Sequence, residues 1–498
     1  MKLRSLSVAC AIALVTPVVA MAAEVDIGKL YRGDYRVDQN DLANMSRDEI
    51  RLAGMRMFTN PFLKSEGFGD GNDNPPSPTV GSNHEGERGT IQGNGTFQRI
   101  NGLDAQTCLE CHSIISRRTV PMKFGIGGVG GVNNTVLGAG GADLVDLTKQ
   151  DKKTNINGRV INPPFIFGAG GIELLANEMT LELQAQIAAA KTAGDGDYPL
   201  SAKGISFGSI SIVGGVIDAT NAEGTFDLDP NSDNFMVVAP FGRKGDAKST
   251  RTFDIGALSF HFGMGINPFF VDEEGKTVED KLDDHDVDGV PNEVTVGELS
   301  ALSVFVGTAQ TPFAKEAKGE ALRGRQIMED IGCTECHVPS METNSKFVGF
   351  RSPEVAKNPL ANVHTTIDLT KKPMHFEKND NGGVTVELFA DLKRHYMGEN
   401  LENFAGDGMF TTMRLWGVAD TAPYLHDGRA LTLKDAIVTH GLDTASEAND
   451  AVSQFNGLVP EDQDAVLAFL DTLRSPDGTF EDLQDLAKGV AKAQGVPK

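Results

Sequence analysis

Two short strings of the form Cys-x-x-Cys-His constrain this chain more than any other feature. The first comprises Cys108, Cys111 and His112, and the second comprises Cys333, Cys336 and His337. Two thiols one helical turn apart can reach the two vinyl groups on one edge of a haem, and the adjacent imidazole then lies under the iron as its proximal ligand. The strings therefore predict two covalently bound haems c. Redox or zinc motifs are the alternative, but neither explains why a histidine follows each cysteine pair.

The N-terminus has the pattern of a secretory signal peptide. Lys2 and Arg4 precede an apolar run over residues 6–19, which ends in the small residues Ala20-Met-Ala22. This pattern predicts a signal peptide over residues 1–22 and export to the periplasm. The run is too short to span a bilayer, and no other segment has eighteen uninterrupted apolar residues, so we expect no membrane span. The fifth cysteine, Cys10, is expected to leave with the peptide.

The chain is acidic, with a formal net charge of -24 at pH 7. Such a charge argues against nucleic acid or anionic lipid as a partner. It would suit docking of a small basic redox protein, a cytochrome c or a cupredoxin, as electron donor. Scattered acidic residues also keep a protein soluble, and this simpler explanation remains open.

An internal repeat indicates how the chain is organised. Residues 298–312 and 462–476 align without a gap, and both have the apolar spacing of an amphipathic helix that stops before proline. Each follows a Cys-x-x-Cys-His string, as the closing helix of a cytochrome c domain would. We therefore expect a mainly α chain with two cytochrome c-like domains in tandem, the first enlarged by loop insertions. The expected boundaries are an N-terminal extension over 23–89, domains over 90–315 and 316–476, and a tail over 477–498.

Four blocks carry a resemblance to a known family. Residues 415–441 read LWGVADTAPYLHDGRALTLKDAIVTHG and residues 391–398 read DLKRHYMG, while 168–173 (GAGGIE) and 241–242 are two further blocks. Together they resemble the di-haem oxidoreductase (putative peroxidase) family, which is related to bacterial di-haem cytochrome c peroxidases and to the methylamine-utilisation di-haem enzyme. The resemblance implies that hydrogen peroxide is reduced at the N-terminal haem and that electrons enter through the C-terminal haem.

The resemblance also bears on the sixth ligand of the second haem. Met409 falls where the related peroxidases have their distal methionine, and a thioether ligand would raise the potential of that haem. Met413, Met397, His395 and His440 are nearby alternatives. A methionine is more often core filler than ligand, so Met409 is favoured by its register alone.

Glu173 is the expected acid–base group. Cleavage of peroxide needs a side chain that moves a proton from one oxygen to the other. Glu173 ends the glycine-rich block at 168–173, where the backbone can approach a cofactor closely. The alternative is an acidic residue that stabilises a helix N-terminus.

Residues 284–295 resemble a calcium-binding loop. Its candidate ligands are Asp284, Asp286, Asp288, Asn292 and Glu293. Position twelve of the loop is Thr295 instead of glutamate, so this is not a complete EF-hand loop. A solvated acidic turn is the alternative to calcium.

Three functional classes stay open at this point. A peroxidase needs an accessible first haem, whereas an oxygenase needs a haem that keeps dioxygen bound. An electron carrier needs six-coordinate iron at both sites. A protein-modifying enzyme is a further alternative to the peroxidase. His426 could have a catalytic role or could hold a tight turn. The single tryptophan, Trp416, could bridge the haems or could simply pack.

Overall fold

The computed structural model describes residues 36–59, 162–262, 293–402 and 406–477, together with four two-residue strands and seven single positions. The strands are β1 (Thr90–Ile91), β2 (Thr96–Phe97), β3 (Ala142–Asp143) and β4 (Asn155–Ile156). The single positions are 62, 66, 107, 108, 112, 264 and 266. All structural statements below concern these residues.

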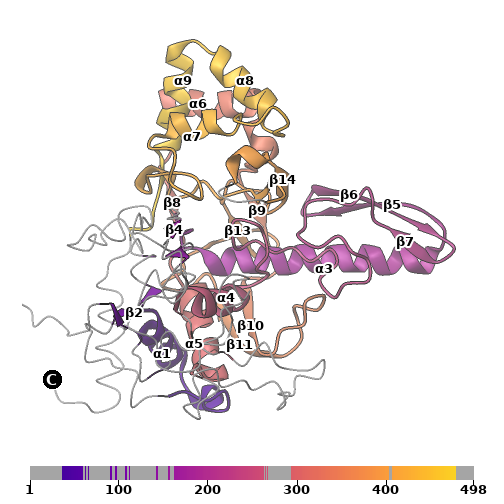
Figure 1. Ribbon diagram of the computed structural model, residues 1–498, viewed down its shortest axis with the longest axis vertical. Coiled ribbons are helices and arrows are strands. Elements are labelled where there is room, and N and C mark those ends of the chain that lie inside the picture. The colour runs from indigo at the N-terminus through magenta and orange to yellow at the C-terminus, as the bar shows by residue number, and fades with distance from the viewer. Residues whose placement is uncertain are drawn as a thin grey trace, which may run out of the picture.

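Helices alternate with small sheets along this part of the chain (Figure 1). The α-helices are α1 (Arg47–Thr59), α3 (Ala169–Ala193), α4 (Thr250–Phe262), α5 (Val296–Gly307), α6 (Glu320–Asp330), α7 (Leu433–Thr439), α8 (Asn449–Gly457) and α9 (Pro460–Leu470). Helices α6 to α9 form a lobe at one end, and α1, α4 and α5 lie at the other. No helix among the described residues is both long and apolar enough to cross a membrane.

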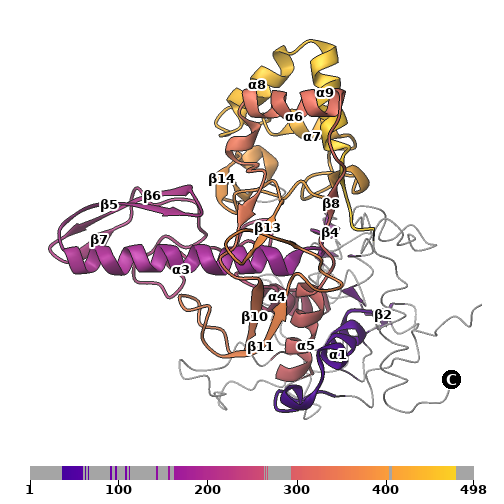
Figure 2. The same cartoon turned by 180° about the vertical axis from the view of Figure 1, so that it is seen from behind.

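The sheets have two or three strands, and all their named pairings are antiparallel. One sheet joins β5 (Gly196–Ala202), β6 (Ile205–Val213) and β7 (Val216–Asp218), and another joins β9 (Met341–Glu342), β13 (Val384–Val386) and β12 (Glu377–Lys378). The paired strands are β10 (Phe347–Arg351) with β11 (Val363–Asp368), β14 (Arg394–Tyr396) with β15 (Met409–Thr411), and β8 (Phe313–Ala314) with β16 (Leu473–Arg474). Strands β5 to β7 lie along the outer half of α3, and the two views show this unit projecting as an arm (Figure 2).

The two repeated segments form α5 and α9, and each crosses a second helix at a glycine. Helix α5 packs on α1, and α9 packs on α6. A Cβ atom on Gly54 of α1 would collide with the carbonyl oxygen of Ala301, and one on Gly324 of α6 would collide with that of Ala465. Ala301 and Ala465 occupy the same position in the repeat. The same close helix crossing therefore occurs twice, and α1, whose residues we had placed in the N-terminal extension, takes part in one of the two.

The helix boundaries follow from local chemistry. Thr295 caps α5, because its hydroxyl accepts the backbone N–H of Glu298 while the Glu298 carboxylate accepts the backbone N–H of Thr295. Helix α9 has Pro460 at its first position, where no N–H is needed. Both helices end before the prolines that close the repeated segments, Pro312 and Pro476.

Apolar side chains form two clusters. The smaller one unites α6, α8 and α9 with Phe389 and Val418, and Cys333 packs against it. The larger one contains α1, α3 and α5 and also receives strands β10 and β13 from the stretch that follows the second string. Residues 341–392 are thus packed on the first half of the chain.

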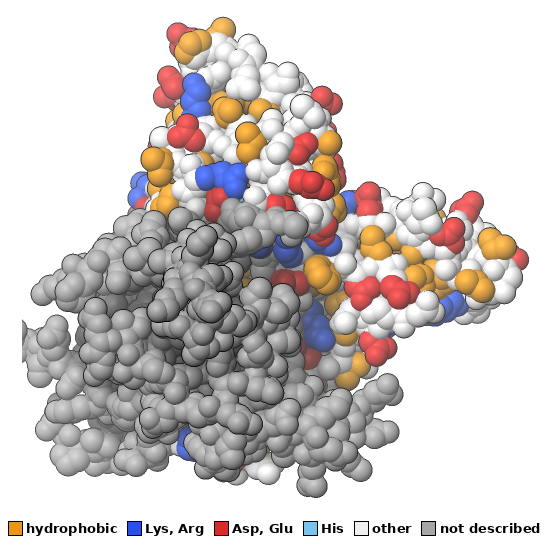
Figure 3. Space-filling view, in the orientation of Figure 1, with side chains coloured by type: hydrophobic (Ala, Val, Ile, Leu, Met, Phe, Trp, Pro, Cys, Tyr) orange, Lys and Arg blue, Asp and Glu red, His pale blue; other side chains and the backbone are white. Residues whose placement is uncertain are grey.

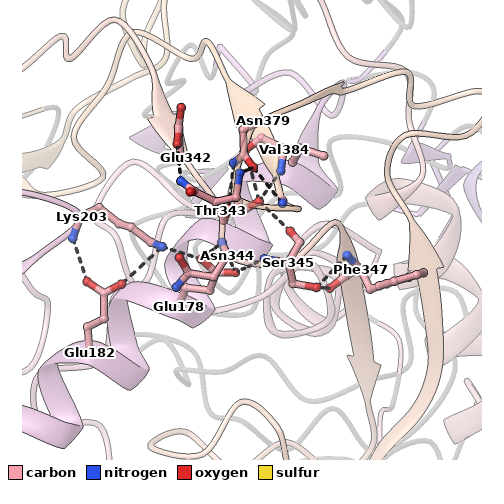
Figure 4. Close-up of polar contacts among 12 residues, drawn as sticks. Glu178, Glu182, Lys203, Glu342, Thr343, Asn344, Ser345, Phe347, Asn379 and Val384 are labelled. Atoms are coloured by element: carbon pink, nitrogen blue, oxygen red, sulfur yellow. Dashed lines mark hydrogen bonds and ion pairs between the residues drawn. The ribbon is translucent and has the colours of Figure 1, made fainter.

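Helix α3 is tied to this stretch by a buried carboxylate. Figure 4 shows Glu178 accepting the backbone N–H groups of Asn344 and Ser345, while Lys203 from the β5–β6 turn lies 2.6 Å from the same carboxylate. A buried charge must be paired and hydrogen-bonded, and Glu178 is both. The contact fixes the start of β10 against the middle of α3.

Candidate functional site

The second Cys-x-x-Cys-His string follows α6 directly. Gly332, with φ of 85°, ends the helix, and a single 3-10 turn spans Cys333–Glu335. The backbone N–H of His337 then bonds to the carbonyl of Cys333 at 3.0 Å. Cys333 and Cys336 are half-buried. The string is therefore held as one compact turn at the base of the α6–α9 pair.

The imidazole of His337 has one nitrogen available for a metal. Its Nδ1 atom lies 3.0 Å from the carbonyl oxygen of Phe389. A carbonyl can only accept, so Nδ1 carries the proton and Nε2 keeps its lone pair, which is the usual arrangement of a ligating histidine. Burial lowers the pKa of His337 to about 4, and the neighbouring His440 adds to this shift. The ring is therefore neutral at pH 7 and able to bind iron.

The carbonyl group of Phe389, which accepts this hydrogen bond, belongs to a residue with a rare backbone conformation. Phe389 has φ of 54°, a conformation that bulky side chains rarely adopt. Its own N–H bonds to the carbonyl of Pro339, and its ring packs edge-on against Phe469 of α9. These contacts hold the carbonyl toward His337. Sequence reasoning missed Phe389, since its contribution is a backbone group.

His395 contacts the second string at Cys336. Its Nε2 bonds to Asp391 and its Nδ1 to Glu447, both at 2.7 Å, and Nδ1 also lies 3.9 Å from the sulfur of Cys336. Burial alone would lower the pKa of His395, but the hydrogen bonds with Asp391, Cys336 and Glu447 raise it to about 12. The ring is an imidazolium with both nitrogens engaged, so it has no lone pair for iron. Cys336, Asp391 and His395 are close enough to form a small metal-binding group, but the charged His395 opposes this.

The methionine candidates lie in and beside the β14–β15 pair. Met409 opens β15 opposite Tyr396, and its carbonyl oxygen accepts a hydrogen bond from Lys244 at 2.9 Å. Met397 follows β14, and its sulfur lies 3.9 Å from the hydroxyl of Ser446. His440, the last alternative, has its ring centre 6.4 Å from that of His337.

The first string is described at Cys108 and His112, while Cys111 lies outside the described residues. The backbone N–H of His112 bonds to the carbonyl of Cys108 at 2.8 Å, the same turn as in the second string. The His112 ring lies 6.3 Å from Phe58 of α1, which packs against Phe305 of α5. Each string thus lies beside one of the two glycine-based helix crossings.

Glu173 is buried in the second turn of α3, with an exposed fraction of 2 %. One carboxylate oxygen accepts the backbone N–H and the hydroxyl of Thr250 at 2.9 and 2.8 Å, and the other lies 3.1 Å from Arg351. Burial raises the pKa of Glu173, and the charge of Glu354 adds to this, whereas Arg351 and Thr250 oppose it. The carboxylate is held firmly at the start of α4.

A second carboxyl with a raised pKa lies close to Glu173. Asp254 of α4 is buried, and the hydroxyl of Ser303 lies 3.2 Å from its carboxylate. Burial raises its pKa well above the ordinary value, and the charge of Glu173 raises it further. Two interacting carboxyls in a buried setting can exchange and hold a proton, which is a common property of functional sites.

Three buried side-chain nitrogens within residues 414–426 have no hydrogen-bond partner among the described residues. They are Nε of Arg414, Nε1 of Trp416 and Nε2 of His426. Burial lowers the pKa of Arg414 to about 10, and a second of its nitrogens bonds to the carbonyl of Phe165. Buried polar atoms without partners indicate a missing polar group. The carboxylates of a haem would supply one, so these residues fit that cofactor.

Trp416 lies at the start of α3 and belongs to the larger apolar cluster. A Cβ atom on Gly168, which has φ of 73°, would collide with the indole, and Phe376 lies 6.5 Å from it. The ring is 4 % exposed. Packing is therefore one role of this residue, as the simpler of the two expectations had it.

The predicted calcium loop falls mostly outside the described residues. Of its candidate ligands only Glu293 is described; it is buried, and its carbonyl oxygen accepts a hydrogen bond from Arg36 at 2.9 Å. Asp284, Asp286, Asp288 and Asn292 lie in the undescribed part of the chain.

Of three comparisons with known proteins, one identifies a family. No curated protein matches. A Kuenenia stuttgartiensis hydrazine synthase structure under xenon pressure is 15 % identical, with a TM-score of 0.25 over 60 % of this chain and 85 % of that one. A MauG-like protein associated with microbial copper homeostasis is 16 % identical, with the same TM-score over 62 % and 88 %. The profile of the di-haem oxidoreductase, putative peroxidase family matches residues 197–473, more than half of the chain. The chain therefore belongs to this family of haem-dependent oxidoreductases.

Proposed function

We propose that the chain carries two covalently bound haems c and reduces hydrogen peroxide at the haem of Cys108, Cys111 and His112. Electrons enter through the haem of the second string. The observation that carries the proposal is the hydrogen bond from His337 Nδ1 to the carbonyl of Phe389, which leaves Nε2 free beside two half-buried cysteines. Haem iron supplies electron exchange and, where one face is open, a binding position for peroxide.

Carboxyl groups of the chain would carry the protons that peroxide reduction requires. Glu173 would take the proton from one peroxide oxygen and return it to the other. Its raised pKa supports this role, because a carboxyl that binds its proton more tightly than usual can take up a proton from peroxide and release it again. Asp254 would share that proton, and Arg351 would hold Glu173 in place.

We further propose that each haem belongs to its own cytochrome c-like unit. The two helix crossings, α1 with α5 and α6 with α9, support this arrangement. In this proposal α1 joins the first unit, and residues 341–392 are an insertion of the second unit that packs on the first. Calcium bound by residues 284–293 would belong to the first unit.

The proposed site of action is the periplasm, after removal of residues 1–22. A small basic cytochrome c or cupredoxin would deliver the electrons. On the face in Figure 3, Asp and Glu side chains are scattered over the helical lobe and the arm among basic and apolar ones. A donor would therefore meet a diffuse negative charge on this face, which favours fast and transient docking.

Peroxide should reoxidise the fully reduced protein at both haems. Each hydrogen peroxide takes two electrons and two protons and gives two waters, so one equivalent should return both haems to the ferric state. Anaerobic titration followed by optical and EPR spectra measures this ratio. If both haems stay reduced after peroxide is added, the protein is an electron carrier. If they react only with dioxygen and an organic substrate, it is an oxygenase.

A further inference from the structure

We propose that His440 is the sixth ligand of the second haem iron, opposite His337, so that this haem is held between two imidazoles. The inference rests on the proposed attachment of a haem at Cys333 and Cys336. It replaces Met409, which we had expected from its register alone.

The distance between the two rings fits one metal ion between them. Their centres are 6.4 Å apart and their planes are inclined by 68°. A metal–imidazole bond is about 2 Å long, and a ring centre lies roughly 1 Å behind its nitrogen, so two imidazoles on opposite faces of one metal have centres about 6 Å apart.

Both rings also present the same nitrogen. His440 Nδ1 lies 2.7 Å from the carbonyl oxygen of Ala436, just as His337 Nδ1 lies 3.0 Å from that of Phe389. Each carbonyl requires a proton on Nδ1 and leaves the lone pair on Nε2. Two half-buried histidines that present the same nitrogen in this way can both ligate one metal ion.

His440 is fixed in position by the helical lobe. It ends α7, and its carbonyl oxygen accepts a hydrogen bond from Ser446 at 2.7 Å. Ile437 of the same helix packs on the smaller apolar cluster, against which Cys333 also packs. The two histidines are therefore attached to the same packed unit.

Two of the competing ligands have their side-chain donor atoms in contact with other described groups, whereas the described contacts of Met409 are made by its backbone. His395 has both nitrogens engaged by carboxylates. Met409 is held through its backbone in the β14–β15 pair and by Lys244. Met397 has its sulfur beside the hydroxyl of Ser446.

Two imidazoles would define the task of the second haem. An iron closed on both faces cannot bind peroxide, so this haem only passes electrons and the chemistry is left to the first. Without a thioether ligand its potential is lower than in a His–Met cytochrome. Of the two proposed donors, a low-potential cytochrome c would suit this haem better than a cupredoxin.

The test uses the complete two-haem protein with His440→Gly. The oxidised variant should lose one low-spin EPR signal and gain a high-spin one, and the reduced variant should bind one more equivalent of carbon monoxide than the native protein. Added imidazole should restore the low-spin signal. His375→Gly, at an exposed histidine with φ of 60°, is the matched control and should leave the spectra unchanged.

A second substitution covers the case in which His440→Gly does not fold. His440→Met should keep the second haem six-coordinate and raise its reduction potential. The inference is overturned if both His440 variants keep the native spectra and potential, or if Met409→Leu loses the low-spin signal instead. Haem content, measured on every variant, separates this failure from failure of the proposed function, since a chain with no haem on the second string would refute both.

Discussion

Gly324→Ala should lower the free energy of unfolding by about 2 to 3 kcal/mol. The new methyl group would collide with the carbonyl oxygen of Ala465, so α6 and α9 would have to move apart. Since the second string follows α6 directly, the separation should also loosen the turn that holds Cys333 and His337. Urea unfolding followed by circular dichroism measures the loss of stability.

Gly457→Ala is the matched control for this substitution. Gly457 ends α8, and a Cβ atom there would have no heavy atom within 4 Å. Alanine is the better helix former, so this change should be neutral or should stabilise by up to about 1 kcal/mol. Equal effects of the two substitutions would contradict the close approach of α6 and α9.

Glu173→Gln should slow peroxide turnover by about a hundredfold or more, because the amide cannot carry the proton. The amide oxygen can still accept the hydrogen bonds of Thr250, so the start of α4 should keep its place. The optical spectra of both haems should remain those of the native protein. Steady-state peroxide consumption with an artificial electron donor measures the rate.

Glu178→Gln separates a proton role from a purely structural one. Glu178 lies on the same helix and is also a buried carboxylate in an ion pair, with Lys203. Its substitution should lower thermal stability and leave the turnover rate within a factor of about two. If Glu173→Gln behaves like Glu178→Gln, then Glu173 only anchors α4 and Arg351, and the proton carrier is another group.

Local features of this protein could be predicted from its sequence. Residues 298–312 and 462–476 were expected to contain helices that end before proline, and α5 and α9 lie there. Such helix signals act within a few residues of one another: the apolar spacing, the Thr295 cap and the prolines. They can therefore be recognised in the sequence alone. The family was also predicted correctly, since its motifs are contiguous strings.

Features that depend on distant contacts were not predicted. The carbonyl of Phe389 lies 52 residues from His337, and a backbone acceptor has no residue type that could signal it. The pairing of α1 with α5 needs Gly54 to meet Ala301, far along the chain. The choice between Met409 and His440 as the haem ligand depends on which side chain the fold brings beside His337. The position of a residue relative to a sequence motif does not show this.

The most direct test of this account is the mass of the intact protein, purified after maturation with the periplasmic haem-attachment machinery. The account predicts the signal-cleaved chain plus two haems, with the added mass on the peptides that contain Cys108 and Cys111 and those that contain Cys333 and Cys336. A chain that carries one haem, or none, would contradict it.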